Sequence, residues 1–293
     1  MPHLVGKTGL PFYRVIIVGR TAFLPVFYGQ TGMSDLPNQG RMVIRPYVFS
    51  CFFIKTIYNC IFNLMSTISE NLKRLEDRIE KAASRSSRGK EDITLVAVSK
   101  NIEPERIIEG IDAGIKIIGE NRIQEAEEKF KFITKDVEKH LVGHLQTNKV
   151  KKAIELFDLI QSVDSLHLAQ EISKRGNDKG KIAEILIEVN TSGESSKYGI
   201  KPEEVSSLVD QISELVNVKI KGLMTIGLLT EEKEKIKPCF VKLRNLFESL
   251  KSLKKENVEM RYLSMGMSSD FEIAIEEGAN MIRIGTAIFG PRM

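Results

Sequence analysis

Residues 93–100 read Ile-Thr-Leu-Val-Ala-Val-Ser-Lys, and this stretch decides the fold. A run of apolar and β-branched residues is typical of a buried strand, and here it ends at Ser99 and Lys100, shortly before a helix start at Pro104. Proteins of the α/β class place their chemistry at the carboxyl ends of such strands. A lysine desolvated there has a lowered pKa and a free amine that condenses with an aldehyde. A strand-end lysine without any chemical role is the alternative interpretation.

The chain after residue 93 alternates strand and helix patterns. Repeated βα units imply a parallel sheet, and eight of them close into a (β/α)8 TIM barrel. A doubly wound open sheet is the alternative, but it normally has a glycine-rich phosphate turn where this chain has Ser99-Lys100-Asn101. We expect strands at 93–99, 115–120, 139–144, 159–164, 183–190, 219–226, 259–265 and 280–287, and amphipathic helices at 103–113, 122–133, 147–157, 165–175, 202–216, 231–255 and 269–277.

An amphipathic helix is predicted to precede the first strand. Thr67-Ile68-Ser69-Glu70 has the pattern of a capping box, with Thr67 as N-cap and Glu70 as the third helical residue. Polar residues fill the face opposite the apolar stripe, so we expect one helix that ends near Ser84. The folded unit therefore spans 65–293. The apolar stripe consists of Ile68, Leu72, Leu75, Ile79 and Ala82.

Residues 1–64 differ in composition from the rest of the chain. They hold six Lys and Arg residues against one acid, Asp35, and they show no sustained helical or strand period. A targeting peptide and a membrane anchor at 47–64 are two interpretations, but the first lacks amphipathicity and the second is interrupted by Lys55. We favour a third, in which 1–64 is an extension that is disordered or lies upstream of the true start at Met65.

Composition excludes several classes of function. The net charge of +4 is small for 293 residues, so it supports no nucleic-acid role. Three cysteines occur without a CxxC motif or Cys/His spacing, so neither a disulfide framework nor a metal site is expected.

Polar and small residues gather where the predicted strands end. In barrels, the loops after strands 7 and 8 frequently bind phosphate through backbone N–H groups and a helix start. Gly266 permits close approach of a ligand to the backbone, and Ser268 and Ser269 offer hydroxyls at the head of the next helix. Gly285 and Thr286 offer the same after the last strand. A capped helix start with a tight turn is the alternative for each loop.

A reactive lysine opposite a phosphate site predicts pyridoxal 5′-phosphate (PLP) as the cofactor. Arg283 shares strand parity with Gly285, so both are expected to face the barrel interior. An arginine cannot accept a proton from the ring nitrogen of the cofactor, which weakens the cofactor as an electron sink. A salt bridge at the barrel rim is the alternative role for Arg283.

Four segments together resemble the pyridoxal phosphate homeostasis protein family, which is related to the barrel domain of alanine racemase. The resemblance covers 65–293 and implies a fold-type III barrel that binds PLP without robust turnover. It implies a Schiff base at Lys100, phosphate contacts from Ser268, Gly285 and Thr286, Arg283 at the ring nitrogen and Asn121 in the pocket. The segments are LVAVSK (95–100), IGENRIQEAEEK (118–129), HLVGHLQTNK (140–149) and SMGMSSDFEIAIEEGANMIRIGTAIFG (264–290).

Other polar residues have a structural interpretation beside a functional one. His144 is either a hydrogen-bonded rim residue, which we favour, or a general base, whereas His140 and His167 are expected at the surface or in packing. Glu120 either supports the site as an acid or pairs with Arg122. A basic helix start forms a solvated face or guides an anionic ligand, and it contains Lys149, Lys151 and Lys152.

The function expected from these features is buffering or delivery of PLP in the cytoplasm by a monomer or weak dimer. Its partners would be PLP and apo-forms of PLP-dependent enzymes, with no nucleic acid and no membrane, and no catalytic residue is assigned. A PLP-dependent amino-acid racemase is the main alternative, and it requires a base on each face of the substrate carbon. A phosphosugar enzyme in which Lys100 binds a substrate carbonyl is a weaker one.

Overall fold

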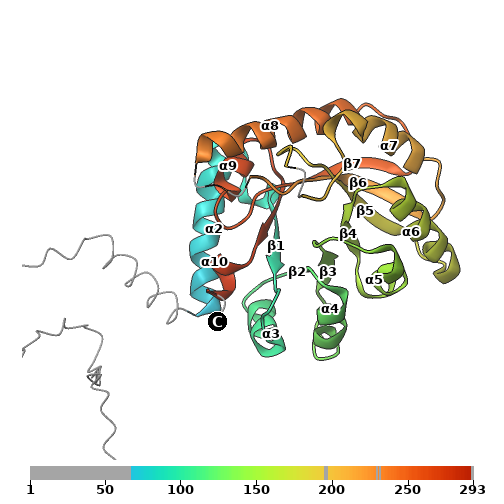
Figure 1. Ribbon diagram of the computed structural model, residues 1–293. Helices are drawn as coiled ribbons and strands as arrows, with labels where there is room; N and C mark the ends of the chain where they lie inside the picture. Colours follow the sequence, from blue (N-terminus) through green and yellow to red (C-terminus); the bar gives the residue numbers. More distant parts are fainter. Residues whose placement is uncertain (1–66, 195–196, 229, 231, 292–293) are drawn as a thin grey trace, which may run out of the picture. The chain divides into compact units, whose positions relative to one another are not determined.

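Eight parallel strands form a closed barrel in chain order, and the last strand pairs with the first (Figure 1). The computed structural model describes residues 67–194, 197–228, 230 and 232–291. The extension predicted at 1–64 and its membrane-anchor alternative lie outside the described residues. The strands are β1 (Thr94–Val98), β2 (Ile117–Glu120), β3 (Glu138–Leu141), β4 (Leu159–Val163), β5 (Ala183–Glu188), β6 (Val218–Met224), β7 (Val258–Ser264) and β8 (Met281–Ile284).

Helices alternate with the strands and surround the barrel. The predicted (β/α)8 fold is confirmed, and closure between β1 and β8 excludes the open doubly wound sheet. No helix in the described ranges is both long and apolar enough to cross a lipid bilayer. The helices are α2 (Ile68–Arg85), α3 (Pro104–Asp112), α4 (Ile123–Phe130), α5 (Val150–Leu156), α6 (Leu166–Lys179), α7 (Val205–Ile212), α8 (Lys233–Leu250), α9 (Phe271–Glu276) and α10 (Thr286–Phe289), with short 3-10 turns at Lys90–Asp92, Thr147–Lys149 and Pro202–Glu204.

Two predicted boundaries near the site are wrong. The last strand was expected to reach residue 287, but β8 ends at Ile284 because Thr286 already begins α10. The helix expected at 269 begins at Phe271 instead. The carboxylate of Asp270 accepts a hydrogen bond of 2.6 Å from the backbone N–H of Met267, and this contact closes a turn before the helix. Thr286 therefore belongs to a helix instead of a strand, and Ser269 lies in the turn before α9.

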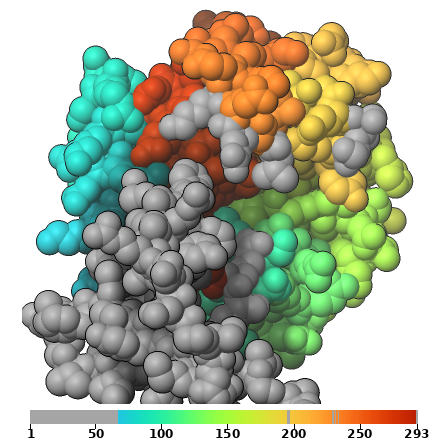
Figure 2. Space-filling model, turned by 60° about the vertical axis from the view of Figure 1, so that its left-hand side comes forward, coloured from blue at the N-terminus to red at the C-terminus, as the bar shows by residue number. Residues whose placement is uncertain are grey.

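Helix α2 fills the place of an eighth outer helix. Its capping box forms as predicted, because Glu70 N–H donates to Thr67 Oγ1 at 3.2 Å and Thr67 N–H donates to Glu70 at 3.1 Å. The whole predicted apolar stripe is buried. It packs on α9 and α10, and Figure 2 shows α2 beside the carboxyl-terminal segment. Since α10 has only four residues, α2 supplies the cover that β8 lacks.

The core has two parts. A larger cluster fills the space between the sheet and the helices, and a smaller one lies inside the barrel. Side chains alternate between the two along each strand, so Ile282 and Ile284 face the helices while Met281 faces the interior. This alternation also sends Arg283 inward, as predicted from its parity. The inner cluster consists of Val96, Val142, Leu159, Leu186, Met224 and Met281.

Candidate functional site

Lys100 lies in the turn that follows β1 and is half-buried. In the part of the chain that the structure describes, its ammonium has neither a hydrogen-bond nor an ion-pair partner. Gly285 lies beside the end of β1, where a Cβ atom on this glycine would approach the carbonyl oxygen of Val98 to 3.0 Å. The absence of a side chain at Gly285 therefore lets the end of β8 pack closely against the end of β1, the strand that leads to Lys100.

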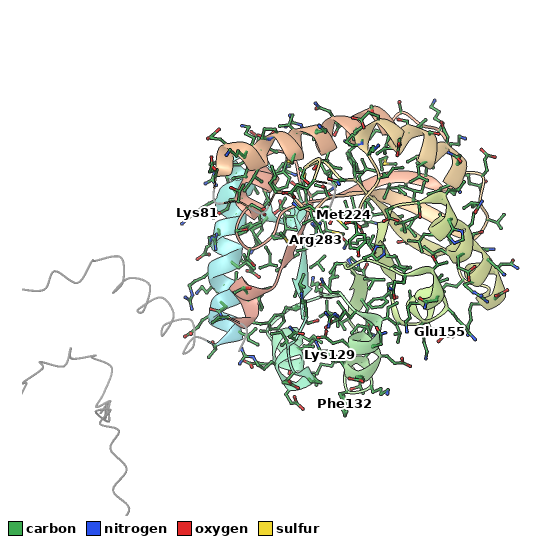
Figure 3. All side chains as sticks on the ribbon, viewed as in Figure 1. Lys81, Lys129, Phe132, Glu155, Met224 and Arg283 are labelled. Atoms are coloured by element: carbon green, nitrogen blue, oxygen red, sulfur yellow. The ribbon has the colours of Figure 1, made fainter. Side chains whose placement is uncertain are left out.

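A buried lysine of α4 holds the residues that flank Lys100. The ammonium of Lys129 donates to the backbone carbonyl of Ser99 at 2.6 Å, to Glu120 Oε1 at 2.9 Å and to Glu125 Oε1 at 2.5 Å (Figure 3). The hydroxyl of Ser99 also donates to Glu120 Oε1 at 2.7 Å. On the other side of Lys100, the backbone N–H of Asn101 donates to Glu125 Oε1 at 2.5 Å. One ion-pair cluster thus fixes both neighbours of Lys100.

The flanking turn contains a residue in the left-handed region. Asn101 has φ of +58°, a conformation that asparagine adopts more readily than most residues other than glycine. Burial raises the pKa of Glu120, and its hydrogen bonds from Ser99 and Lys129 oppose that rise. Its second oxygen is buried without a partner among the described residues. Glu120 therefore acts as a supporting acid, and its predicted alternative pairing with Arg122 is wrong.

Arg283 lies inside the barrel mouth and is 5% exposed (Figure 3). Its Nη1 donates to Ser264 Oγ at 2.6 Å and its Nη2 donates to the backbone carbonyl of Thr225 at 2.7 Å. No described residue accepts a hydrogen bond from its Nε. Arg283 forms no salt bridge within 4.0 Å among the described residues, so the rim ion pair predicted as its alternative role is wrong.

A buried carboxyl group faces the same region from β5. Burial, together with the nearby charge of Asp164, raises the pKa of Glu188 to about 7, although the charge of Arg283 opposes the rise. Burial in turn lowers the pKa of Arg283 to about 10, against the attraction of Glu188 and Asp270. Glu188 Oε2 has no hydrogen-bond partner in the described ranges. The barrel mouth therefore combines a fixed cation with a carboxyl group that titrates near neutrality.

Gly266, in the loop after β7, is required by packing. It has φ of +96°, and a Cβ atom there would lie 2.9 Å from the Cα of Phe271 and 2.6 Å from the Cβ of Ala274. The glycine therefore lets this loop pack tightly against α9. Its predicted role in admitting a ligand to the backbone is untested. Burial raises the pKa of Asp270, which holds the same loop through Met267 N–H.

The loops after β7 and β8 meet at one cavity of about 330 Å³. Ser268 and Thr286 both line it, as the prediction of a shared phosphate site requires. Ser269 is exposed and does not line the cavity, and neither Lys100 nor Arg283 does. Helix α2 contributes the opposite wall, which the sequence pattern did not associate with the site. The wall residues from α2 are Asn71, Arg74, Leu75 and Arg78.

Asn121 follows β2 and is half-buried at the same end of the barrel. Gly143 lies against it, because a Cβ atom on Gly143 would approach the Asn121 backbone oxygen to 2.3 Å. The loops after β2 and β3 are therefore in direct contact.

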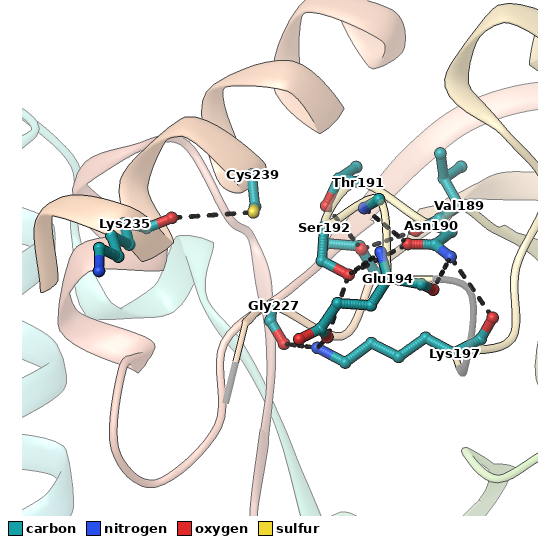
Figure 4. Close-up of polar contacts among 11 residues, drawn as sticks. Val189, Asn190, Thr191, Ser192, Glu194, Lys197, Gly227, Lys235 and Cys239 are labelled. Atoms are coloured by element: carbon teal, nitrogen blue, oxygen red, sulfur yellow. Dashed lines mark hydrogen bonds and ion pairs between the residues drawn. The ribbon is translucent and has the colours of Figure 1, made fainter. Parts of the chain in front are cut away.

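The rim beyond β3 and β5 is braced by side chains. His144 stacks on Tyr198 with a distance of 3.8 Å between ring centroids, and its Nδ1 lies 3.9 Å from Asp164 Oδ2. Lys197 donates to the carbonyl of Gly227 at 2.9 Å, which ties the loop after β5 to the loop after β6 (Figure 4). These contacts agree with the favoured interpretation of His144 as a rim residue.

The remaining predicted residues lie away from the mouth. His140 is fully buried inside the barrel, in agreement with the packing alternative, whereas His167 is exposed on α6, in agreement with the surface alternative. Lys152 pairs with Glu127 at 2.6 Å, as expected for a solvated basic face.

Sequence reasoning missed the two residues that hold the Lys100 turn. Glu125 and Lys129 stand four residues apart in α4, a spacing that indicates an ion pair on a helix surface. That spacing could have drawn attention to the pair, but only the fold shows that it reaches back to Ser99 and Asn101.

Several known proteins are similar to this chain. Residues 71–293 match the family described as alanine racemase, N-terminal domain. A pyridoxal phosphate homeostasis protein of Aquifex aeolicus is 46% identical over 224 residues, which cover 76% of this chain and 97% of that protein.

Solved structures of a related protein are also similar to this chain. PipY of Synechococcus elongatus without PLP is 35% identical, with a TM-score of 0.70 over 76% of this chain and all of that chain. The structure of PipY with PLP bound is 34% identical with a TM-score of 0.67, at the same coverage.

Proposed function

The chain belongs to the pyridoxal phosphate homeostasis protein family, and from this premise we propose that it binds PLP at Lys100 and buffers or delivers it. The observation that carries the proposal is the presentation of Lys100. Its ammonium has no polar partner among the described residues, and Lys129 and Glu125 hold the two residues on either side of Lys100 in place. Such an arrangement presents an amine to a ligand while the backbone around it stays fixed.

The residues around Lys100 fit the cofactor. When bound, PLP supplies an aldehyde for an amine, a phosphate group and a ring that withdraws electrons. The hydroxyls of Ser268 and Thr286 line one cavity and would hold the phosphate, with Gly285 beside them. Asn121 would line the pocket, and Gly266 and Ser269 would shape the phosphate loop.

Arg283 supports binding without rapid turnover. Its guanidinium only donates hydrogen bonds, and its Nε has no acceptor among the described residues. Directed at the ring nitrogen, it would keep that nitrogen unprotonated, because an arginine cannot supply a proton at neutral pH. A cofactor held in this way is a weak electron sink, so we propose little or no catalytic turnover.

The attachment at Lys100 is tested by reduction of the loaded protein with borohydride. Purified protein incubated with PLP should absorb in the visible range, and after reduction peptide mass spectrometry should find the cofactor on Lys100. Lys100→Ala should abolish the attachment, whereas Lys174→Ala, which removes an exposed lysine of α6, should not. Attachment to another lysine, or no binding by the natural protein, would contradict the proposal.

A PLP-dependent racemase is the second candidate. Racemisation needs a base on each face of the substrate carbon, and His144, 3.9 Å from Asp164, is the described histidine at the rim. The two functions are separated by incubating the loaded protein with amino acids in heavy water. Rapid exchange of the α-proton would favour the racemase, and slow or absent exchange would favour the carrier.

Delivery is proposed to occur in the cytoplasm, by a monomer or weak dimer acting on apo-enzymes without nucleic acid or membrane partners. The loaded protein should activate an apo-enzyme faster than the same amount of PLP released from a non-specific carrier. Equal rates would contradict direct delivery and leave a buffering role.

A further inference from the structure

A chain of polar side chains crosses the interior of the barrel. Four of its members are buried and come from four different strands: His140 on β3, Gln161 on β4, Ser264 on β7 and Arg283 on β8. They lie among the apolar side chains of the inner cluster. Buried polar groups are costly unless they are hydrogen-bonded, so a continuous set of them inside a barrel requires a physical reason.

The hydrogen bonds connect the barrel mouth to the opposite end. Arg283 Nη1 donates to Ser264 Oγ at 2.6 Å, and this hydroxyl donates to Gln161 Oε1 at 2.7 Å. Gln161 Nε2 lies 2.9 Å from His140 Nδ1, and His140 Nε2 lies 2.7 Å from Glu138 Oε1. Glu138 begins β3 and its side chain is 44% exposed. This series of hydrogen bonds therefore links Arg283, at the carboxyl ends of the strands, to the solvent-exposed carboxylate of Glu138 at their amino ends.

Each member of the chain determines the orientation of the next. The amide nitrogen of Gln161 can only donate, so Nδ1 of His140 must accept and the ring proton must lie on Nε2, directed at Glu138. The Gln161 oxygen then points at Ser264, whose hydroxyl donates to it and presents a lone pair to Arg283. A proton on Nδ1 of His140 would require the Gln161 amide to turn. The hydroxyl of Ser264 would then lose its acceptor while still facing the Arg283 donor.

We propose that Gln161 and His140 are positioning residues for Arg283, and that the hydrogen-bond state of His140 is coupled to PLP binding at the opposite end of the barrel. The proposal rests on the proposed function, because Arg283 is taken to contact the cofactor ring. The coupling is reciprocal by thermodynamic necessity, so binding at the mouth must alter His140 as much as His140 alters binding.

Several charged groups surround the exposed end of the chain. Glu138 contacts His140 directly and interacts electrostatically with Arg261 and Tyr262 of β7. Lys221 of β6 and Glu184 of β5 act on Tyr262 in the same way. The hydrogen bond from His140 lowers the pKa of Glu138, so its carboxylate remains charged and keeps the Nε2 proton in place near neutral pH.

The first test measures the natural protein, and a variant serves only to assign its resonances. The ¹⁵N resonances of His140 are followed by NMR during titration with PLP, and they are assigned by their absence in His140→Gln. We expect a shift of both ring nitrogens of His140 that saturates with PLP occupancy. Unchanged His140 resonances at full occupancy would overturn the proposal. Absence of PLP binding by the natural protein would instead refute the proposed function.

The second test removes the central side chain of the hydrogen-bonded series. Gln161→Met preserves side-chain volume but removes the hydrogen bonds of Gln161 with His140, Ser264 and the sulfur of Met281. We expect PLP to bind 3- to 30-fold more weakly, with no response of His140. Ser173→Ala is the control, because it also removes a buried hydrogen bond, from Ser173 to the carbonyl of Val216 on the outer side of the barrel. It should change neither PLP affinity nor the His140 response. Unchanged affinity in Gln161→Met, or an equal loss in Ser173→Ala, would overturn the positioning role.

Discussion

The ammonium of Lys129 donates a hydrogen bond of 2.6 Å to the backbone carbonyl of Ser99, the residue that precedes Lys100. The two lysines differ completely in surroundings. Lys129 is buried between Glu120 and Glu125, whereas Lys100 is half-buried and has no polar partner among the described residues. One lysine therefore stabilises the fold of the turn, and the other is left available to a ligand.

This difference predicts that removing Lys129 lowers stability much more than removing Lys100. Lys129→Met should lower the free energy of unfolding by about 3 to 5 kcal/mol at pH 8, because it leaves Glu120 buried without its cation. The loss should be smaller at pH 5, since burial raises the pKa of Glu120 and a protonated carboxyl needs no cation. Lys100→Ala should change stability by less than about 0.5 kcal/mol. Urea denaturation measures both, and equal losses would contradict the assignment.

Glu188 predicts a pH dependence of stability. Burial raises its pKa to about 7 from the usual 4.5, so the folded state holds the proton more tightly than the unfolded chain. Its contribution to the free energy of unfolding is therefore fully present below pH 4.5, falls as the pH rises and is lost above about pH 7. Glu188→Gln should remove this dependence and raise stability at pH 8 by up to about 3 kcal/mol. The free energy of unfolding of both proteins is measured at pH 5 and pH 8. An equal change with pH in the two proteins would contradict this prediction.

Gly266 and Gly285 should separate stability from binding. Gly266→Ala should lower the free energy of unfolding by about 1 to 3 kcal/mol, because its φ of +96° and its contact with Phe271 leave no room for a methyl group. Gly285 has φ of −115°, which any residue adopts, but a Cβ atom there would lie 3.0 Å from the carbonyl oxygen of Val98, so Gly285→Ala should lower stability less than Gly266→Ala. It should instead weaken PLP binding about tenfold, a loss of about 1.4 kcal/mol. Thermal unfolding and PLP titration distinguish the two effects.

Helix α2 is predicted to be part of the cooperative unit. Ile79→Ala removes a side chain that is 4% exposed and should cost about 2 to 5 kcal/mol, with one unfolding transition for the whole barrel. Lys73→Ala on the exposed face of the same helix is the matched control and should cost less than about 0.5 kcal/mol. A separate early transition in Ile79→Ala would show that α2 unfolds independently.

Local patterns in the sequence determined much of this protein. Apolar β-branched runs alternating with amphipathic stretches predicted all eight strands, because hydrophobic periodicity reflects which face of each element is buried. The capping box at Thr67 was readable for the same reason, since its two hydrogen bonds join residues three positions apart. Strand parity also sent Arg283 inward, as the structure shows.

Only the tertiary structure decided which distant side chains meet. The contact of Lys129 with Ser99 spans 30 residues, that of Ser264 with Gln161 spans 103, and that of Asn71 with the carbonyl of Ile288 spans 217. Such pairs depend on barrel closure and register, which no local period encodes. The sequence by itself thus located Lys100 at the end of a strand, and the closed barrel supplied the cluster that holds its turn and the polar chain behind Arg283.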